Sequence, residues 1–184
     1  MNKILLAILI VVVVLGGYVW MTYNRMVTGS ENVDNAWAQV ETQYQRRLDL
    51  IPNLVESVKG VMKQEQTVFS DITEARTRYA SAATVNDKAQ AATQVESALS
   101  RLLVVMENYP QLKSAENVQT LMAQLEGTEN RISVERKRFN DAAKDFNVMI
   151  KRVPAKWLAS MFGFSEKDYF QAAGGAENTP SVKF

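Results

Sequence analysis

The chain has 184 residues, with 21 lysines and arginines against 20 aspartates and glutamates, and it contains no histidine and no cysteine. This length suits one membrane segment and one domain of ordinary size. The near-zero net charge argues against a nucleic-acid partner, which is bound by a basic face. Without histidine or cysteine, a Ser-His-Asp or Cys-His centre, a thiolate zinc site and a Glu-x-x-His di-iron site are excluded. We therefore predict no catalytic residues, no metal ligands and no cofactor.

An uncharged stretch of eighteen residues, 4–21, lies near the N-terminus. As a helix it extends about 27 Å, close to the roughly 30 Å of a bilayer core. Tyr18, Trp20 and Tyr23 lie at its far end, where aromatic side chains favour the headgroup level. A cleaved signal peptide is the alternative, but no A-x-A site lies directly after the apolar stretch. We predict a transmembrane anchor in residues 1–24 that contacts membrane lipid through residues 4–21.

The charges that flank this stretch indicate its orientation. Lys3 and the terminal amine precede it, and Arg25, Glu31 and Asp34 follow. Because positive charge favours the cytoplasmic side, we expect a single-pass protein with its soluble domain outside the cytoplasm.

From Glu31 to about Ala83 the sequence predicts one long helix with apolar residues at alternating spacings of four and three. These positions are Val33, Trp37, Val40, Tyr44, Ile51, Leu54, Val58, Val61, Val68, Ile72, Ala75 and Tyr79. This heptad pattern is typical of a helix that packs along its neighbours at a small angle. Pro52 interrupts the pattern without changing its phase, which predicts a kink and no reversal. The alternative is a new helix that begins with Pro52 in its first turn.

Two further helices are predicted. One runs from about Asp87 to Asn108, is capped by Asn86 or Asp87, and stops at Tyr109-Pro110. The other runs from near Ala115 to Pro154, and its heptad positions are Val118, Met122, Leu125, Ile132, Phe139, Ala143, Phe146, Ile150 and Val153.

No strand-like alternation occurs, and the turns are short. The predicted fold is therefore all-α: a transmembrane helix followed, over residues 31–170, by an elongated antiparallel bundle of long heptad-patterned helices. Residues 171–184 are expected to be extended or mobile. Since the first long helix is about twice the length of the second, part of its apolar face needs another subunit, and we expect a homo-oligomer.

Charged residues occupy four of the heptad positions: Arg47 and Glu65, then Glu129 and Arg136. A charge in a helical seam costs desolvation unless it is paired. We interpret these residues as register-fixing ion pairs, or as side chains that reach the bundle edge, rather than as an active site.

The stretch AWAQVETQYQRRLDLIPNLVESVKG, from Ala36 to Gly60, resembles a hallmark of the LemA family. Residues 102–147, with the TENRI motif, and the ending up to Phe184 are also similar to that family. The resemblance implies a membrane anchor, an elongated antiparallel helical domain and no established catalytic residues. LemA-like proteins include one involved in forming magnetosome membranes, and others are often encoded beside membrane metallopeptidases. We accordingly place the chain in a bacterial cell membrane.

Two functions follow from these observations. The first is a membrane-anchored, non-enzymatic scaffold that self-associates or organises partners. The alternative is an adaptor or regulator of a membrane peptidase or envelope-stress complex, in which the QRRLD and TENR motifs form a docking surface. The candidate register or interaction residues are Arg46, Arg47, Asp49, Pro52, Asn53, Glu65, Glu129, Asn130, Arg131 and Arg136.

An aromatic cluster follows Pro154, and Trp157, Phe162 and Phe164 are its candidates for contact with the membrane interface. The alternative, which we favour from the sequence, is that the cluster folds back onto the bundle.

Overall fold

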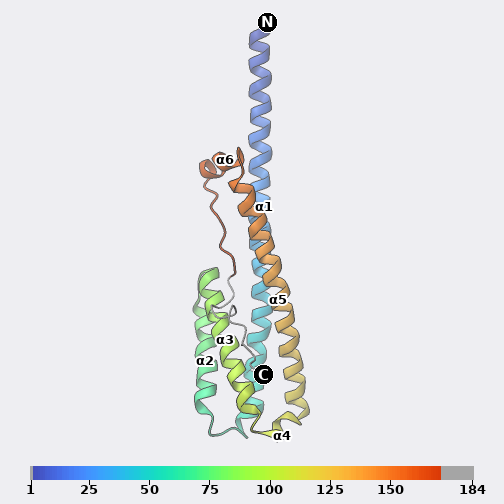
Figure 1. The fold of residues 1–184 in the computed structure, drawn as a ribbon, viewed down its shortest axis with the longest axis vertical. Helices are drawn as coiled ribbons and strands as arrows, with labels where there is room; N and C mark the ends of the chain where they lie inside the picture. Colours follow the sequence, from blue (N-terminus) through green and yellow to red (C-terminus); the bar gives the residue numbers. More distant parts are fainter. Residues whose placement is uncertain (1, 171–184) are drawn as a thin grey trace, which may run out of the picture. The chain divides into compact units, whose positions relative to one another are not determined.

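The computed structural model describes residues 2–170, whose regular secondary structure is helical, with no strand (Figure 1). The helices are α1 (Lys3–Lys59), α2 (Gln66–Ser81), α3 (Val85–Met106), α4 (Pro110–Lys113), α5 (Glu116–Lys151) and α6 (Ala155–Phe162). The all-α prediction is confirmed. The tail predicted over residues 171–184 lies outside the described residues. The chain forms two compact units: residues 2–38 with 137–169, and residues 39–136 with 170.

Helix α1 includes both the uncharged segment and the start of the predicted bundle helix. It continues through Pro52, so the alternative of a new helix at Pro52 is wrong. The prediction of one helix from Glu31 to Ala83 is also wrong, because α1 ends at Lys59 and α2 begins only at Gln66. Gly60, a poor helix former, follows the last helical residue. The amides of Val61 and Met62 both donate to the Val58 carbonyl in the turn that replaces the helix.

The apolar pattern gave wrong predictions of burial just after the ends of α1 and α5. Val61 and Val153 were expected in the seam, but they are 43% and 66% exposed. Each lies just beyond the last residue of a helix, where the helical period no longer determines which way a side chain points. At the first turn the fully buried residue is Met62 instead.

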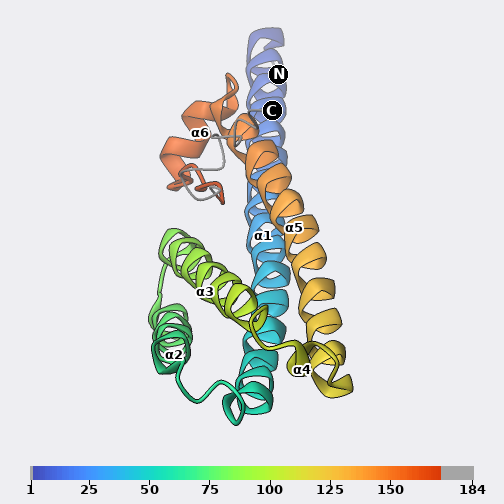
Figure 2. The same ribbon diagram turned by 60° about the horizontal axis from the view of Figure 1, so that its bottom comes forward.

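The second unit is an up-and-down bundle of four helical segments (Figures 1 and 2). They are the end of α1 (residues 39–59), the whole of α2 and α3, and the start of α5 (residues 116–136). Successive long helices run in opposite directions because the connections between them are short. Fully buried side chains from three of these helices form the core: Tyr44, Ile51, Leu54, Leu102 and Ile132. The predicted break at Tyr109-Pro110 is confirmed, with Pro110 in the first turn of α4.

In the first unit, residues 3–38 of α1 accompany residues 137–151 of α5, α6 and the segment 163–169. Met26, Val33, Phe139 and Phe146 are buried here, and the rings of Trp37 and Phe139 meet edge-on at 5.2 Å. The apolar side chains between residues 4 and 15 are exposed. Within the described chain, α1 is the one helix long and apolar enough to cross a membrane.

The segment 163–169 is fixed to both long helices of the first unit. The Asn147 side chain donates to the Lys167 carbonyl and accepts from the Lys167 amide, both at 2.8 Å. The Lys167 ammonium also lies 2.9 Å from a carboxylate oxygen of Asp34. Because Asn147 is buried, the backbone N–H and C=O of Lys167 supply the partners that its side-chain amide requires.

Thr84 caps α3, in place of the predicted Asn86 or Asp87. Its hydroxyl oxygen accepts from the Asp87 amide at 3.1 Å and donates to the Asp87 carboxylate at 2.7 Å. The prediction placed the cap two or three residues late because all three residue types favour this position, and helix boundaries shift easily by that amount.

Replacing the cap should therefore destabilise the second unit. We expect Thr84→Ala to lower the free energy of unfolding by about 1 kcal/mol, because an amide of the first turn loses its acceptor. The measurement is thermal unfolding of the full chain in mild detergent. Thr73→Ala is the control, since the exposed Thr73 hydroxyl only bonds the Phe69 carbonyl within α2. Equal midpoints for the two variants would contradict the assignment.

Candidate functional site

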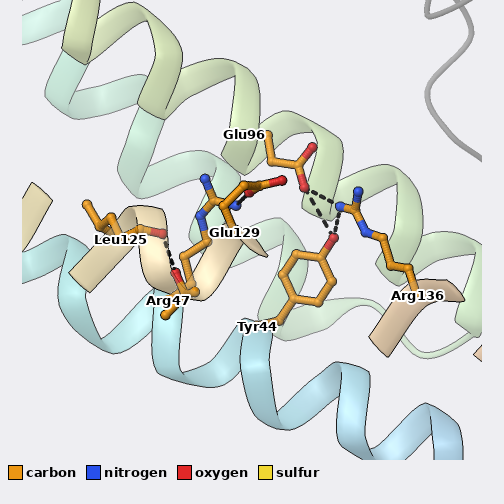
Figure 3. A network of polar contacts seen from close by, with 7 residues as sticks. Tyr44, Arg47, Glu96, Leu125, Glu129 and Arg136 are labelled. Atoms are coloured by element: carbon orange, nitrogen blue, oxygen red, sulfur yellow. Dashed lines mark hydrogen bonds and ion pairs between the residues drawn. The ribbon is translucent and has the colours of Figure 1, made fainter. Parts of the chain in front are cut away.

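The best-defined polar site is the Arg136 cluster, in which Arg136 of α5 meets Tyr44 of α1 and Glu96 of α3 (Figure 3). Phe170 is its fourth member. The Arg136 guanidinium donates to the Tyr44 hydroxyl and to the Glu96 carboxylate. The Tyr44 hydroxyl donates to the same carboxylate at 3.2 Å. The Phe170 ring lies under the guanidinium, 4.5 Å from its carbon. One cation thus joins three helices and the end of the described chain.

The surroundings hold Tyr44 and Arg136 in fixed protonation states. Burial raises the pKa of Tyr44, and the Glu96 carboxylate raises it further, against the opposing effect of Arg136. Burial alone lowers the pKa of Arg136, but its contacts with Tyr44 and Glu96 outweigh this and raise it above its usual value. Near neutral pH the phenol stays neutral and the guanidinium stays charged. Neither group can then act as a general base, whose pKa must lie near the working pH.

Tyr79 and a second ion pair adjoin the Arg136 cluster. The rings of Tyr44 and Tyr79 lie 5.3 Å apart, and the Tyr79 hydroxyl is buried without a hydrogen-bond partner in the described chain. Burial raises the pKa of Tyr79, as does the nearby Glu41 carboxylate. Glu41 pairs with Lys88, which ties α1 to α3. Interior polar groups of this unit therefore serve contacts between helices.

The Arg47–Glu129 pair joins α1 to α5 at a second level of the bundle (Figure 3). Arg47 is 8% exposed, whereas the Glu129 carboxylate reaches the surface. Glu65 is not part of this network: it is half-buried and accepts from the Tyr109 hydroxyl at 3.4 Å. Of the four charged heptad residues, three thus lie in interhelical ion pairs, and Arg136 takes its carboxylate partner from α3.

The other candidates from the two motifs face outward. Arg46, Asp49, Asn53, Asn130 and Arg131 are exposed, and Pro52 is half-buried within α1. Asp49 accepts from the Gln45 side chain at 2.8 Å. A groove of about 720 Å³ lies between α1 and α5, and we call it the polar groove; its lining includes Arg46, Asp49, Leu50, Gln124, Thr128 and Arg131. The QRRLD and TENR motifs therefore each contain residues that face the core and residues that face outward.

A second groove, of about 680 Å³, lies between α3 and α5, and we call it the apolar groove. Its apolar lining is formed by Leu99, Leu103, Met106, Val118, Met122 and Leu125. Charged residues at its edge include Arg47, Glu107, Lys113 and Glu126. The apolar groove is thus a surface hollow with leucine, methionine and valine side chains in its lining.

The three aromatic candidates near the C-terminal end of the first unit differ in their surroundings. Trp157 is 67% exposed. Phe162 is partly exposed and meets the Tyr23 ring edge-on at 4.9 Å. Phe164 is half-buried between Tyr23 and Phe146, with ring centroids 6.1 Å and 6.3 Å away. Phe164 therefore packs onto α1 and α5 within the first unit, while Trp157 is exposed.

Sequence reasoning missed Glu96, Asn147 and Phe170 as site residues. Glu96 was detectable, because it lies four residues after Ala92 and three before Leu99, and so holds a charged heptad position like those identified. Asn147 and Phe170 act through contacts 20 and 34 residues away in sequence, at Lys167 and Arg136. No periodic pattern reports such contacts. Between residues 2 and 170, no group of three or more acidic side chains is arranged to hold a metal ion.

This fold, with its exposed apolar helix and its paired interior charges, defines a membrane-associated helical-bundle protein. The model of the LemA family matches residues 36–184, and the chain belongs to that family.

Similar proteins include Magnetosome protein MamQ 2 and Magnetosome protein MamQ 1 of Paramagnetospirillum magneticum, each 29% identical over 188 aligned positions. Magnetosome protein MamQ of Magnetospirillum gryphiswaldense is 28% identical. Each alignment covers 88% of this chain and 69% of the relative. The resemblance drawn from the sequence motifs is confirmed, and family and N-terminal helix together indicate membrane association.

Removing the central cation should destabilise the bundle strongly. We expect Arg136→Met to lower the free energy of unfolding by about 2–3 kcal/mol, because Glu96 is left half-buried without its cation. Arg131→Met, on the exposed side of α5, should stay within about 0.5 kcal/mol of the unmodified chain. Denaturant unfolding in mild detergent measures both. Adding Glu96→Gln to Arg136→Met should restore part of the loss, and a purely additive double variant would contradict the pairing.

Proposed function

We propose that the chain is a single-pass, membrane-anchored, non-enzymatic scaffold that self-associates at the bacterial membrane. The observation that carries this proposal is the apolar groove between α3 and α5, whose leucine and methionine side chains line a surface hollow beside charged edges. Interior charges of the same unit are taken up by ion pairs between helices. The unit therefore offers surfaces for binding, whereas its interior charged groups already pair with one another between helices.

The anchor supports the membrane part of this proposal. The exposed apolar side chains of residues 4–15 have no covering element in the first unit, and a lipid bilayer would cover them. Lys3 before the segment and Arg25 after it favour, by a small margin, a cytoplasmic N-terminus and an extracytoplasmic bundle. The relatives are named as magnetosome proteins and not as enzymes, which agrees with a structural role.

The first long helix is shorter than the sequence pattern predicted, so its length does not support an uncovered apolar face. Because the chain reverses between Lys59 and Gln66, α2 and α3 both pack in the second unit. The proposal of a homo-oligomer now rests on the apolar groove.

A charge in the apolar groove should weaken self-association. We expect Met122→Glu to raise the concentration needed for dimers by about tenfold or more, since an uncompensated carboxylate in an apolar interface costs over a kcal/mol. Val134→Glu is the control, because Val134 is 50% exposed on the same helix and does not line the groove. Crosslinking and mass measurement of the full chain in mild detergent give the readout. An unmodified chain that stays monomeric at every concentration would refute self-association.

The second candidate function is an adaptor or regulator of a membrane protein such as a metallopeptidase or an envelope-stress complex. The polar groove favours it, because this groove gathers the outward halves of both motifs from α1 and α5. Arg46 and Arg131 would offer bidentate donors to an acidic partner segment.

Charge reversal separates docking from folding. We expect Arg46→Glu and Arg131→Glu to keep the thermal midpoint of the unmodified chain and to lose a partner that co-purifies from membranes. Arg47→Met, by contrast, should lower the midpoint, since it leaves Glu129 without its ion-pair partner. If the outward variants retain every co-purifying protein, the adaptor function is excluded for this surface.

A further inference from the structure

Large apolar side chains are exposed on and just before α6, away from the anchor in sequence. Val153, Trp157 and Met161 are 66%, 67% and 65% exposed. Trp157 and Met161 are four residues apart in α6, so they lie on the same face of that helix. Exposed apolar residues that cluster in this way mark a contact surface.

Contacts within the first unit tie α6 to the end of the anchor. Phe162 meets Tyr23 edge-on at 4.9 Å, and Phe164 lies 6.1 Å from the same ring. Tyr23 follows the last residue of the uncharged segment, Met21, by two positions. A tyrosine at this position lies at the headgroup level when the segment spans the bilayer. If residues 4–21 span the bilayer, these contacts with Tyr23 place α6 at the depth of the membrane–water interface.

The structure also prevents the exposed face of α6 from turning inward. The opposite face is already packed, with Ala159 buried and Leu158 half-buried. Gly163, whose φ of 77° lies in the left-handed region, ends the helix, and the Phe164 amide donates to the Ala159 carbonyl at 2.9 Å. After Gly163, the two hydrogen bonds between Asn147 and the Lys167 backbone hold the following segment in place.

The charges near α6 also fit a membrane surface. Arg152 and Lys156 are exposed beside Trp157, and Arg25 is exposed just beyond Tyr23. Lys151 is engaged by Glu166, whose carboxylate oxygen lies 2.7 Å from its ammonium. A short helix with Trp and Met on one face and basic residues beside it has the composition of an interfacial helix on an anionic bilayer.

We propose that α6 lies in the interface of the same bilayer that the anchor spans, with Val153, Trp157 and Met161 in contact with lipid. This second membrane contact rests on the anchoring proposed above and is independent of self-association. It gives the first unit a second contact with the membrane, in addition to the apolar segment of α1. Phe164, in contrast, serves to hold α6 in place from the protein side.

The absence of cysteine in the sequence makes a direct test simple, since a single introduced thiol carries the only label. The full chain with Met161→Cys is labelled with an environment-sensitive fluorophore and reconstituted into vesicles of phosphatidylcholine and phosphatidylglycerol. Val104→Cys is the matched control, because Val104 on α3 is also 65% exposed. Both sites belong to the same soluble region, so mixed vesicle orientations affect them equally. Trp157→Cys gives a second reading on the α6 face.

The expected result is a blue-shifted emission at positions 161 and 157, quenching by a nitroxide near the lipid headgroup, and at least about twofold less quenching by iodide than at position 104. Equal iodide quenching at all three positions, without nitroxide quenching, would overturn the proposal. Protection at position 161 that disappears as lipid is added in excess would also overturn it, because the contact would then be a second copy. A chain that fails to float with the vesicles would instead contradict the anchoring.

Discussion

A guanidinium placed among packed helices must be matched there, because an unpaired interior charge is far more costly than an unpaired neutral group. In the second unit, Arg136 meets this demand with groups from α1 and α3, and the Phe170 ring covers it. The contacts require Tyr44, Glu96 and Arg136 to lie at one level of the bundle. Apolar seams alone tolerate sliding by a heptad, whereas this cluster does not. The Arg47–Glu129 pair sets the same register at a second level.

The heptad pattern predicted the helical class, and the prolines predicted the break at Tyr109-Pro110 and the end of α5 before Pro154. Neither signal predicted the reversal between Lys59 and Gln66. A heptad count reports which face of a helix is apolar and is silent on the direction of the chain. Residues on either side of a turn can share one phase by coincidence, as Val58 and Val68 do across the turn that follows α1. The signal for the reversal was Gly60 alone, which a continuous helix also tolerates at modest cost.

The sequence predicted those residues of the candidate site that place a charged side chain at a usually apolar heptad position. They are Arg47, Glu129 and Arg136, because a charge in a helical seam costs desolvation unless it is paired. The same reasoning applies to Glu96. Tyr44 was hidden, since a tyrosine satisfies an apolar pattern and its hydroxyl matters only beside Arg136. Adjacent residues separate cleanly for a geometric reason: successive side chains on a helix point about 100° apart, so Arg46 faces the solvent and Arg47 the core.

Asn147 binds the Lys167 peptide group as a receptor binds a short peptide, with one donor and one acceptor at 2.8 Å. Two such hydrogen bonds, at about 0.5–1.5 kcal/mol each, would not retain a free peptide. The covalent path through α6 makes docking of this segment intramolecular, so weak contacts are sufficient. Residues 163–169 therefore stay docked because they are part of the same chain as Asn147. A side chain that offers only donors or only acceptors cannot replace Asn147, because a peptide group presents one of each.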